Sequence, residues 1–392
     1  MKNDFMTLVS SRVGSPPPVF LPSKRLDRLM AEAAGDVRLL GSVTPIDAHR
    51  ERARVILAFE AGFDACPRWE YVKVDRTALF AAIAGAEAEL ARVGSADSSP
   101  ATKRCLALYA ARLREIDLEA RVACAAGTDA IASLARERFA DDDGAVATAA
   151  NALATEWLAT SALEAPKMAT ATMRRSDASD DPRSLLSRMR EEVGRRRLPF
   201  NVIAHSSLAP LAATGARTIF VATDRDVSDE DVERTVLHEI EGHAMPRVRA
   251  AAQPLRIFAI GTARGADDHE GYALVLEERA GHLVANRRTQ LAARHAAVNA
   301  MWEGATFVDA VRLLIRDLGR APRDAVLAAE RAYRGGNALT PGLGRDRIYL
   351  EAFLRVSARL AAQPGDERVL ASGTVSVDAI EALHDYVAES TH

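Results

Sequence analysis

The chain is 392 residues long and carries 51 basic and 54 acidic side chains, which give a formal net charge of −3. With 48% hydrophobic and 27% charged residues, the composition excludes wholesale disorder, a collagen-like repeat and a small disulfide scaffold. The length fits two domains or one large domain, and it allows a core that needs no disulfide or metal to fold.

The same features argue against nucleic-acid and membrane partners. Residues 1–23 are polar and contain three consecutive prolines, unlike a secretory signal. No run approaches the roughly 20 apolar residues of a membrane helix, and no basic patch is interleaved with aromatic residues. Cys66, Cys105 and Cys124 form no CxxC pair. We therefore expect a cytoplasmic protein whose cysteines are reduced core residues.

The first part of the chain has the three- and four-residue apolar spacing of helices. This pattern predicts helices at residues 26–34, 48–62, 77–93, 103–126, 128–139 and 145–163. Polar breaks fall at residues 94–100 and 141–144. The segment 174–184 is rich in Asp, Ser and Arg and is the best candidate for a linker.

After this segment the pattern changes. Short β-branched and aromatic runs at residues 198–204 and 218–222 predict strands. Ser228, with Asp231 three residues later, forms a capping-box pattern and predicts a helix that begins near residue 229. The remainder is mostly helical, with an interruption at residues 334–344.

The helix that begins near residue 229 carries the sequence H-E-x-x-x-H, with histidines at positions 238 and 243. On a regular helix, residues five apart point about 140° away from each other, so two such imidazoles cannot share one ion. The spacing suits a metal only where the helix widens by a π-type turn or ends. We predict this change between Ile240 and His243, where Gly242 makes it least costly. The alternative is a regular helix with both histidines on its solvated face.

A zinc hydrolase needs a third protein ligand and an open position for water. Glu270 is the leading candidate, at the start of a second apolar helix, residues 272–283. Glu277, two turns later, is placed to orient a ligand imidazole. Glu239 follows the first histidine and is the candidate general base for metal-activated water. Two histidines and one carboxylate also bind iron in non-haem oxygenases, so that class of enzyme stays an alternative.

Three stretches together resemble a known family: LHEIEGH at residues 237–243, QPLRIF at residues 253–258, and HEGYA at residues 269–273 with a glutamate at 277. They are similar to the QEGLA-motif proteins, whose animal members are MATCAP-type tyrosine and glutamate carboxypeptidases that trim tubulin tails. The resemblance implies that His238, His243 and Glu270 bind Zn²⁺ and that Glu239 is the base.

The chain departs from the family pattern around the site and not in the ligand set. His269 stands where the family commonly has Gln, and Tyr272 replaces a leucine. Pro246 stands where an arginine is usual, and the pair at 249–250 is Arg-Ala instead of Asn-Gly. We interpret His269 as a neighbour of the site, with an additional acid, base or ligand role as the alternative. These departures leave the substrate undetermined.

A carboxypeptidase must bind a free carboxylate, for which an arginine is the best partner. All five lysines lie at or before residue 167, so a cation in the metal-bearing half is an arginine. We favour Arg334, because the glycine pair after it would let the backbone approach a ligand. Arg345 and Arg264 are rivals. Tyr349 is a candidate to stabilise the oxyanion, and the strand at 218–222 is a candidate edge strand for an extended peptide.

The sequence thus predicts a mostly helical α+β protein, with a helical domain at residues 1–190 and a zincin-like catalytic domain with a small sheet at residues 191–392. The predicted function is a zinc-dependent carboxypeptidase that acts on a peptide or protein C-terminus. Besides the iron oxygenase, the alternatives are a zinc hydrolase that tailors a modified peptide and a binding protein with an idle site.

Overall fold

The computed structural model describes residues 22–96, 99–140, 144–163, 172–206 and 208–387. It is mostly helical with two small sheets, as predicted for the α+β class. The predicted breaks at 94–100 and 141–144 and the N-terminal segment 1–23 lie partly or largely outside the described residues.

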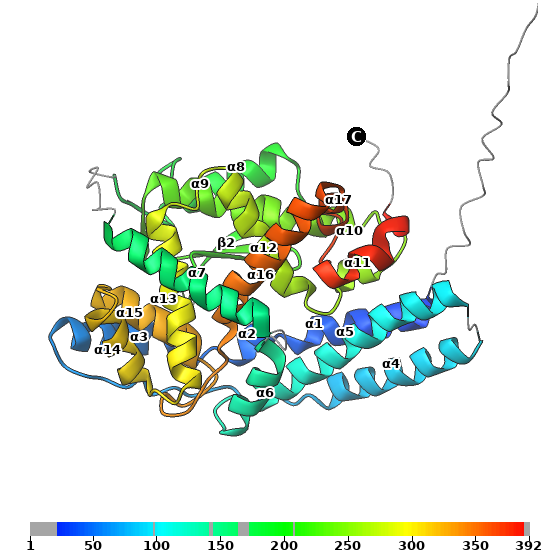
Figure 1. Cartoon of the computed structure of the whole chain (residues 1–392), viewed down its shortest axis with the longest axis horizontal. Coiled ribbons are helices and arrows are strands. Elements are labelled where there is room, and N and C mark those ends of the chain that lie inside the picture. The colour runs from blue at the N-terminus through cyan, green and yellow to red at the C-terminus, as the bar shows by residue number, and fades with distance from the viewer. Residues whose placement is uncertain (1–21, 97–98, 141–143, 164–171, 207, 388–392) are drawn as a thin grey trace, which may run out of the picture.

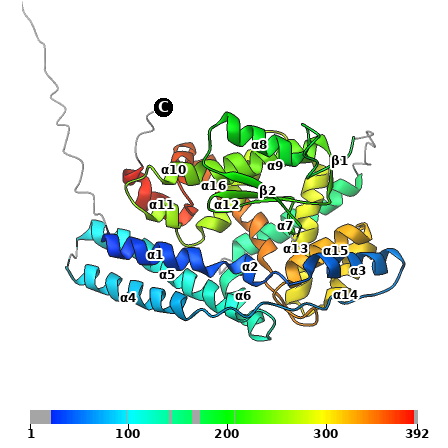
Figure 2. The same ribbon diagram turned by 180° about the vertical axis from the view of Figure 1, so that it is seen from behind.

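The predicted helices of the first half are confirmed, with ends that differ by a few residues. They are α1 (Lys24–Val37), α3 (Ala48–Glu60), α4 (Thr77–Ala96), α5 (Pro100–Cys124), α6 (Ala130–Phe139) and α7 (Gly144–Leu163), and the short α2 (Leu39–Ser42) follows α1. Helices α1, α4 and α5 lie side by side and form one long edge of the molecule (Figures 1 and 2).

The segment predicted as a linker packs against the rest of the protein. β1 (Arg174–Arg175) pairs antiparallel with β5 (Asp226–Val227), and Ser176 is fully buried. An additional helix, α8 (Leu185–Arg195), begins at once after Ser184, whose side chain accepts a hydrogen bond from the backbone N–H of Ser187. The side chains of the segment are polar because they form ion pairs such as Arg174 with Asp181.

The main sheet has the order β2 (Asn201–His205), β4 (Thr218–Ala222), β3 (Ala212–Thr214), with β2 parallel and β3 antiparallel to β4. One face of β4 buries Ile219 and Val221 against α8 and α9 (Asp229–Leu237), and these helices cover the sheet in Figure 2. The opposite face, with Phe220, lines a cavity. β4 is thus the central strand, and the expectation that it is a free edge is wrong.

The second half continues with the π-helix η1 (His238–Ala244) and the helices α10 (Met245–Ala250), α11 (Ile257–Ile260), α12 (Gly265–Arg279), α13 (Ala285–Trp302), α14 (Phe307–Arg316) and α15 (Pro322–Tyr333). After an irregular stretch come η2 (Arg345–Arg347), α16 (Ile348–Ala362), η3 (Pro364–Asp366), α17 (Glu367–Leu370), η4 (Val377–Ala379), α18 (Ile380–Leu383) and η5 (His384–Tyr386). The antiparallel pair α12 and α16 crosses the middle of the molecule (Figure 1).

The largest apolar cluster includes residues from both sides of position 190. Leu26, Tyr109 and Trp157 from the first half share it with Leu274 and Phe353 from the second. The two halves therefore pack on a common core, and the division into domains at residue 190 stays a prediction.

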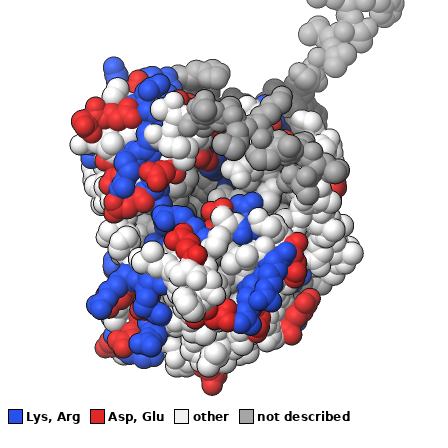
Figure 3. All heavy atoms as spheres, turned by 90° about the vertical axis from the view of Figure 1, so that its left-hand side faces the viewer, with Lys and Arg blue, Asp and Glu red and all other residues white. Residues whose placement is uncertain are grey.

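Other sequence-based expectations concern the surface and the cysteines. No helix among the described residues is long and apolar enough to cross a membrane. On the face shown in Figure 3, basic and acidic side chains are interspersed. All three cysteines are free thiols, but only Cys105 is buried; Cys66 and Cys124 are exposed, so their interpretation as core residues is wrong.

Candidate metal centre and its cavity

The predicted helix start at Ser228 is confirmed by a full capping box. The Ser228 side chain accepts a hydrogen bond from the N–H of Asp231, whose carboxylate accepts one from the N–H of Ser228. The helix stays regular only to Leu237, where the seven-residue π-helix η1 begins.

The predicted widening of the helix lies at the H-E-x-x-x-H motif itself. In a π-helix each N–H bonds to the carbonyl five residues earlier, and the N–H of Met245 bonds in this way to Ile240. Residues five apart therefore lie almost above each other. The ring centroids of His238 and His243 are 5.0 Å apart, so the two imidazoles meet where a regular helix would separate them.

Gly242 brings this π-helix against α12. A Cβ atom at position 242 would lie 2.6 Å from the Cβ of Ala273, far inside van der Waals contact. The absence of a side chain thus lets the two helices approach closely. One turn before Ala273, Glu270 points at the histidines. Because α12 begins at Gly265, Glu270 lies in its second turn and not at a helix start near residue 272, as we expected.

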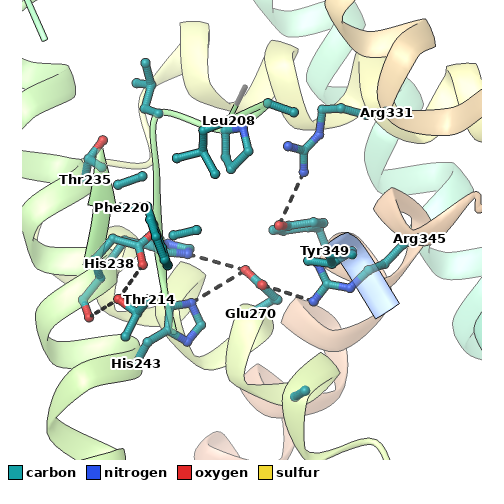
Figure 4. A pocket seen from close by; sticks show the side chains of 18 of the residues that line it. Leu208, Thr214, Phe220, Thr235, His238, His243, Glu270, Arg331, Arg345 and Tyr349 are labelled. Carbon is teal, nitrogen blue, oxygen red and sulfur yellow. Dashed lines mark hydrogen bonds and ion pairs between the residues drawn. The ribbon is translucent and has the colours of Figure 1, made fainter. Parts of the chain in front are cut away.

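The three predicted ligands converge (Figure 4). Oε2 of Glu270 lies 3.4 Å from Nε2 of His238 and 3.7 Å from Nε2 of His243. One ligand atom from each residue lies within 4.8 Å of the others. Two imidazole nitrogens and one carboxylate oxygen on one side of a small space match a site that binds a divalent ion and keeps a position free for water.

The electrostatics of His238 and Glu270 fit a cation. Burial opposes charge on the ring, yet the carboxylates of Glu270 and Glu277 outweigh it and raise the pKa of His238 to about 9. Burial also opposes ionisation of Glu270, but hydrogen bonds from both histidines and the nearby Arg345 hold its pKa well below the usual range. The site thus attracts positive charge, which a proton supplies in the metal-free protein and a metal ion can replace.

Glu277 contacts the first candidate ligand, His238, at the ring nitrogen that faces away from Glu270. Its Oε1 lies 2.7 Å from Nδ1 of His238, so an N–H at Nδ1 leaves the Nε2 lone pair for an ion. Sequence reasoning missed Arg287, which binds the same carboxylate through Nε at 2.9 Å and Nη2 at 3.0 Å. Arg287 lies on another helix and no motif marks it.

A second arginine holds the third ligand. Nη2 of Arg345 lies 3.1 Å from Oε1 of Glu270, the oxygen that does not face the histidines. Arg345 therefore occupies one carboxylate oxygen and leaves the other for a metal. Its predicted role as a rival binder of a substrate carboxylate is less favoured, since its guanidinium already has this partner.

The candidate base is buried and fixed in place. Glu239 is 5% exposed, and its Oε2 accepts a hydrogen bond from the Thr214 hydroxyl at 2.7 Å. Thr214 lies on β3, the edge strand beside the site, and sequence analysis predicted neither the strand nor the contact.

A cavity of about 710 Å³ opens over the three ligands. One wall is uncharged and comes from α2, β3, β4 and the loop before β3, with Leu208 and Phe220 in view in Figure 4. The cavity is lined by arginines and, among the described residues, by no lysine: the arginines are Arg234, Arg247, Arg287, Arg294, Arg331, Arg334 and Arg345.

The predicted substrate-binding residues Arg334 and Tyr349 both line this cavity, whereas Arg264 does not. Arg334 is 7% exposed, and within the described residues its guanidinium has no hydrogen-bond or ion-pair partner. Burial and the neighbouring charge of Arg331 lower its pKa to about 10. The hydroxyl of Tyr349 lies 3.5 Å from Nη2 of Arg331.

The glycine pair after Arg334 has a different role from the one expected. A Cβ atom at Gly335 would lie 2.5 Å from Cδ1 of Ile131, and one at Gly336 would lie 3.0 Å from the carbonyl oxygens of Thr340 and Pro341. The glycines therefore allow close packing within the protein, and neither of them is among the described residues that line the cavity.

The comparison with protein families agrees with the motifs. The chain belongs to the MATCAP family, described as microtubule-associated tyrosine carboxypeptidase, whose model matches residues 59–391. The match includes every residue of the candidate metal centre, and it makes the chain a member of a carboxypeptidase family. No curated protein matches the chain.

Proposed function

We propose that this member of the MATCAP family is a zinc-dependent carboxypeptidase that releases a residue from the C-terminus of a peptide or protein. The observation that carries the proposal is the convergence of His238, His243 and Glu270 beside the buried carboxylate of Glu239. The predicted cytoplasmic location belongs to the same proposal.

The metal-binding part of the proposal rests on the donor set. Nε2 of His238, Nε2 of His243 and Oε2 of Glu270 would hold the ion, while Glu277 and Arg345 fix the orientation of two of these ligands. Bound zinc lowers the pKa of a coordinated water to about 7 and polarises a carbonyl oxygen.

Glu239 moves the proton in this proposal. A carboxylate beside the attacking water accepts its proton and then donates it to the leaving amine, a role that contributes about 10²- to 10⁴-fold to the rate. The Thr214 hydroxyl supports this role, since it holds one carboxylate oxygen at 2.7 Å and leaves the other oxygen for the water.

Arg334 is the proposed binder of the substrate α-carboxylate. Its guanidinium is buried and unpartnered among the described residues, and a buried cation without a partner is costly unless an anion joins it. Arg331 is less suitable, because Asp346 already binds it through both carboxylate oxygens. Tyr349, between Arg331 and Arg345, is the proposed donor to the oxyanion.

β3 replaces β4 as the strand proposed to pair with an extended substrate. It is an edge of the sheet, it lines the cavity, and Thr214 links it to the base. The family description names tyrosine as the residue removed. Peptides that end in tyrosine, in other residues or in a modified residue test whether this chain shares that preference.

The iron oxygenase remains the second candidate, because its ligand set is also two histidines and one carboxylate. The buried Glu239 favours hydrolysis, since an oxygenase needs no such base. Metal analysis of the freshly purified protein distinguishes the two: zinc supports the proposal, and iron with oxygen-dependent turnover overturns it.

The direct test is C-terminal residue release from a mixed peptide pool, read by mass spectrometry with and without a chelator. We expect release that the chelator abolishes. The Glu239→Gln variant should lose activity by about 10²-fold or more and retain its metal. Glu230→Gln, at an exposed position on α9, the helix that leads into η1, should behave as wild type. Activity that survives in Glu239→Gln would refute the role of Glu239 as the base. If no sample, wild type included, released a C-terminal residue, a binding protein with an idle site would be favoured.

A further inference from the structure

The carbonyl of Gly242 lies where the π-helix passes into α10, and it needs a hydrogen-bond donor. In a regular helix this donor is the N–H four residues later, but residue 246 is proline, which has no N–H. Gly242 is buried, so a carbonyl there that loses a hydrogen-bond donor destabilises this part of the helix.

His269 makes a hydrogen bond to this carbonyl. Its Nδ1 lies 3.2 Å from the carbonyl oxygen of Gly242, and the ring is 3% exposed. On its other side, Nε2 lies 3.3 Å from the backbone N–H of Val375. A ring that donates at Nδ1 and accepts at Nε2 is a neutral imidazole of one tautomer. Both nitrogens are engaged, which argues against the alternative that His269 is an additional metal ligand.

The segment that His269 contacts is itself tied to α12 and the residues before it. The N–H of Ser376 donates to the Thr262 hydroxyl at 2.8 Å, and the N–H of Val377 donates to Oδ2 of Asp268 at 2.8 Å. Three consecutive backbone N–H groups thus bind three side chains from residues 262–269. His269 connects this fixed segment to the π-helix.

We propose that His269 is a positioning residue that holds the end of the π-helix, and with it His243, in the geometry that binds the metal. His243 follows Gly242 directly, so a shift of the Gly242 carbonyl also moves the imidazole. The inference rests on the proposed zinc site. Glutamine is the conservative replacement for His269, because its side chain also offers a donor group and an acceptor group.

The test measures zinc affinity by competition with a chromogenic chelator in the purified full-length protein. His269→Leu removes both hydrogen bonds at similar volume, and we expect zinc affinity to fall by about 10- to 100-fold, as for other residues that orient metal ligands. His269→Gln should recover affinity to within a few-fold of wild type. His384→Gln, at an exposed position, is the matched control and should change nothing.

Wild-type affinity in a folded His269→Leu variant, or a glutamine variant as weak as the leucine one, would overturn the proposal. Absence of zinc binding in the wild type would instead refute the proposed function itself.

Discussion

Glu277→Gln is the sharpest test of how the protein supports its metal ligands. The carboxylate is fully buried and accepts three hydrogen bonds, one from His238 at 2.7 Å and two from Arg287 at 2.9 and 3.0 Å. Glutamine keeps the shape but removes the charge and one acceptor. The buried guanidinium of Arg287 then loses its ionic partner.

Two magnitudes follow from these contacts. Removing one member of a buried ion pair costs about 3–5 kcal/mol of stability, and loss of a group that orients a metal ligand costs about 10- to 100-fold in affinity. Charge from Arg287 and hydrogen bonds from it and from His238 outweigh burial and hold the pKa of Glu277 below its usual value. A depressed carboxyl pKa stabilises the fold above the unfolded pKa of about 4.3, and this contribution is lost as the pH falls.

The assay combines chemical denaturation from pH 7 to pH 3 with zinc competition at pH 7. We expect Glu277→Gln to be less stable than wild type at pH 7, and the difference to narrow below about pH 4.3. The control is Glu278→Gln, the same change of charge at the next position, which is exposed. Equal stability and equal zinc affinity in Glu277→Gln and wild type would refute the reasoning.

Three further predictions follow from the same contacts. Gly242→Ala places a Cβ 2.6 Å from that of Ala273, so it should lower the free energy of unfolding by about 1–3 kcal/mol and weaken zinc binding; unchanged values would contradict the close helix approach. Thr214→Val should lower kcat by about 10- to 100-fold through misplacement of Glu239 while Thr214→Ser retains activity, and equal kcat in the two variants would remove the role of the hydroxyl. The pKa of His238 is raised from 6.5 to about 9, so the metal-free protein should become less stable as the pH rises from 6.5 to 9, and its zinc affinity should increase over the same range. Calorimetry in the presence of a chelator measures the stability, and an increase in stability over this range would contradict the prediction.

The helix that carries the H-E-x-x-x-H motif could be predicted because residues close together in the sequence determine it. Ser228 and Asp231 form their capping box within four residues. The five-residue histidine spacing suits a shared ion only where the helix widens or ends, and Gly242 permits the widening. Predictions failed where a neighbour distant in sequence decides the outcome. The sequence Ala-Ala-Thr of β3 has no strand pattern of its own and becomes a strand because it pairs with β4. That pairing, with β2 on the other side, also makes β4 central.

The sequence did not reveal the roles of Arg287 and of the glycine pair at 335–336 for a related reason. Arg287 is one of many arginines, and its partner Glu277 lies ten residues away on another helix, so no spacing rule links them. The glycine pair at 335–336 carried a real signal, but the sequence does not say whether a ligand or the protein itself fills the adjacent space. Helix α8, with its N-cap at Ser184, was not predicted, because the polar residues before it indicated a linker.

Two of the arginines that line the cavity fix the orientation of a buried carboxylate. Arg287 holds both oxygens of Glu277, and Arg331 holds both oxygens of Asp346, an arrangement that needs the planar fork of a guanidinium. Lysine is a point charge and would keep the ion pair but not the fixed orientation. Since Glu277 sets the direction of the His238 ring, Arg287→Lys should weaken zinc binding, but less than Glu277→Gln, which loses the charge as well. If Arg287→Lys weakened zinc binding more than Glu277→Gln in the same competition assay, the orientation that Arg287 gives to Glu277 would matter more than the charge of Glu277.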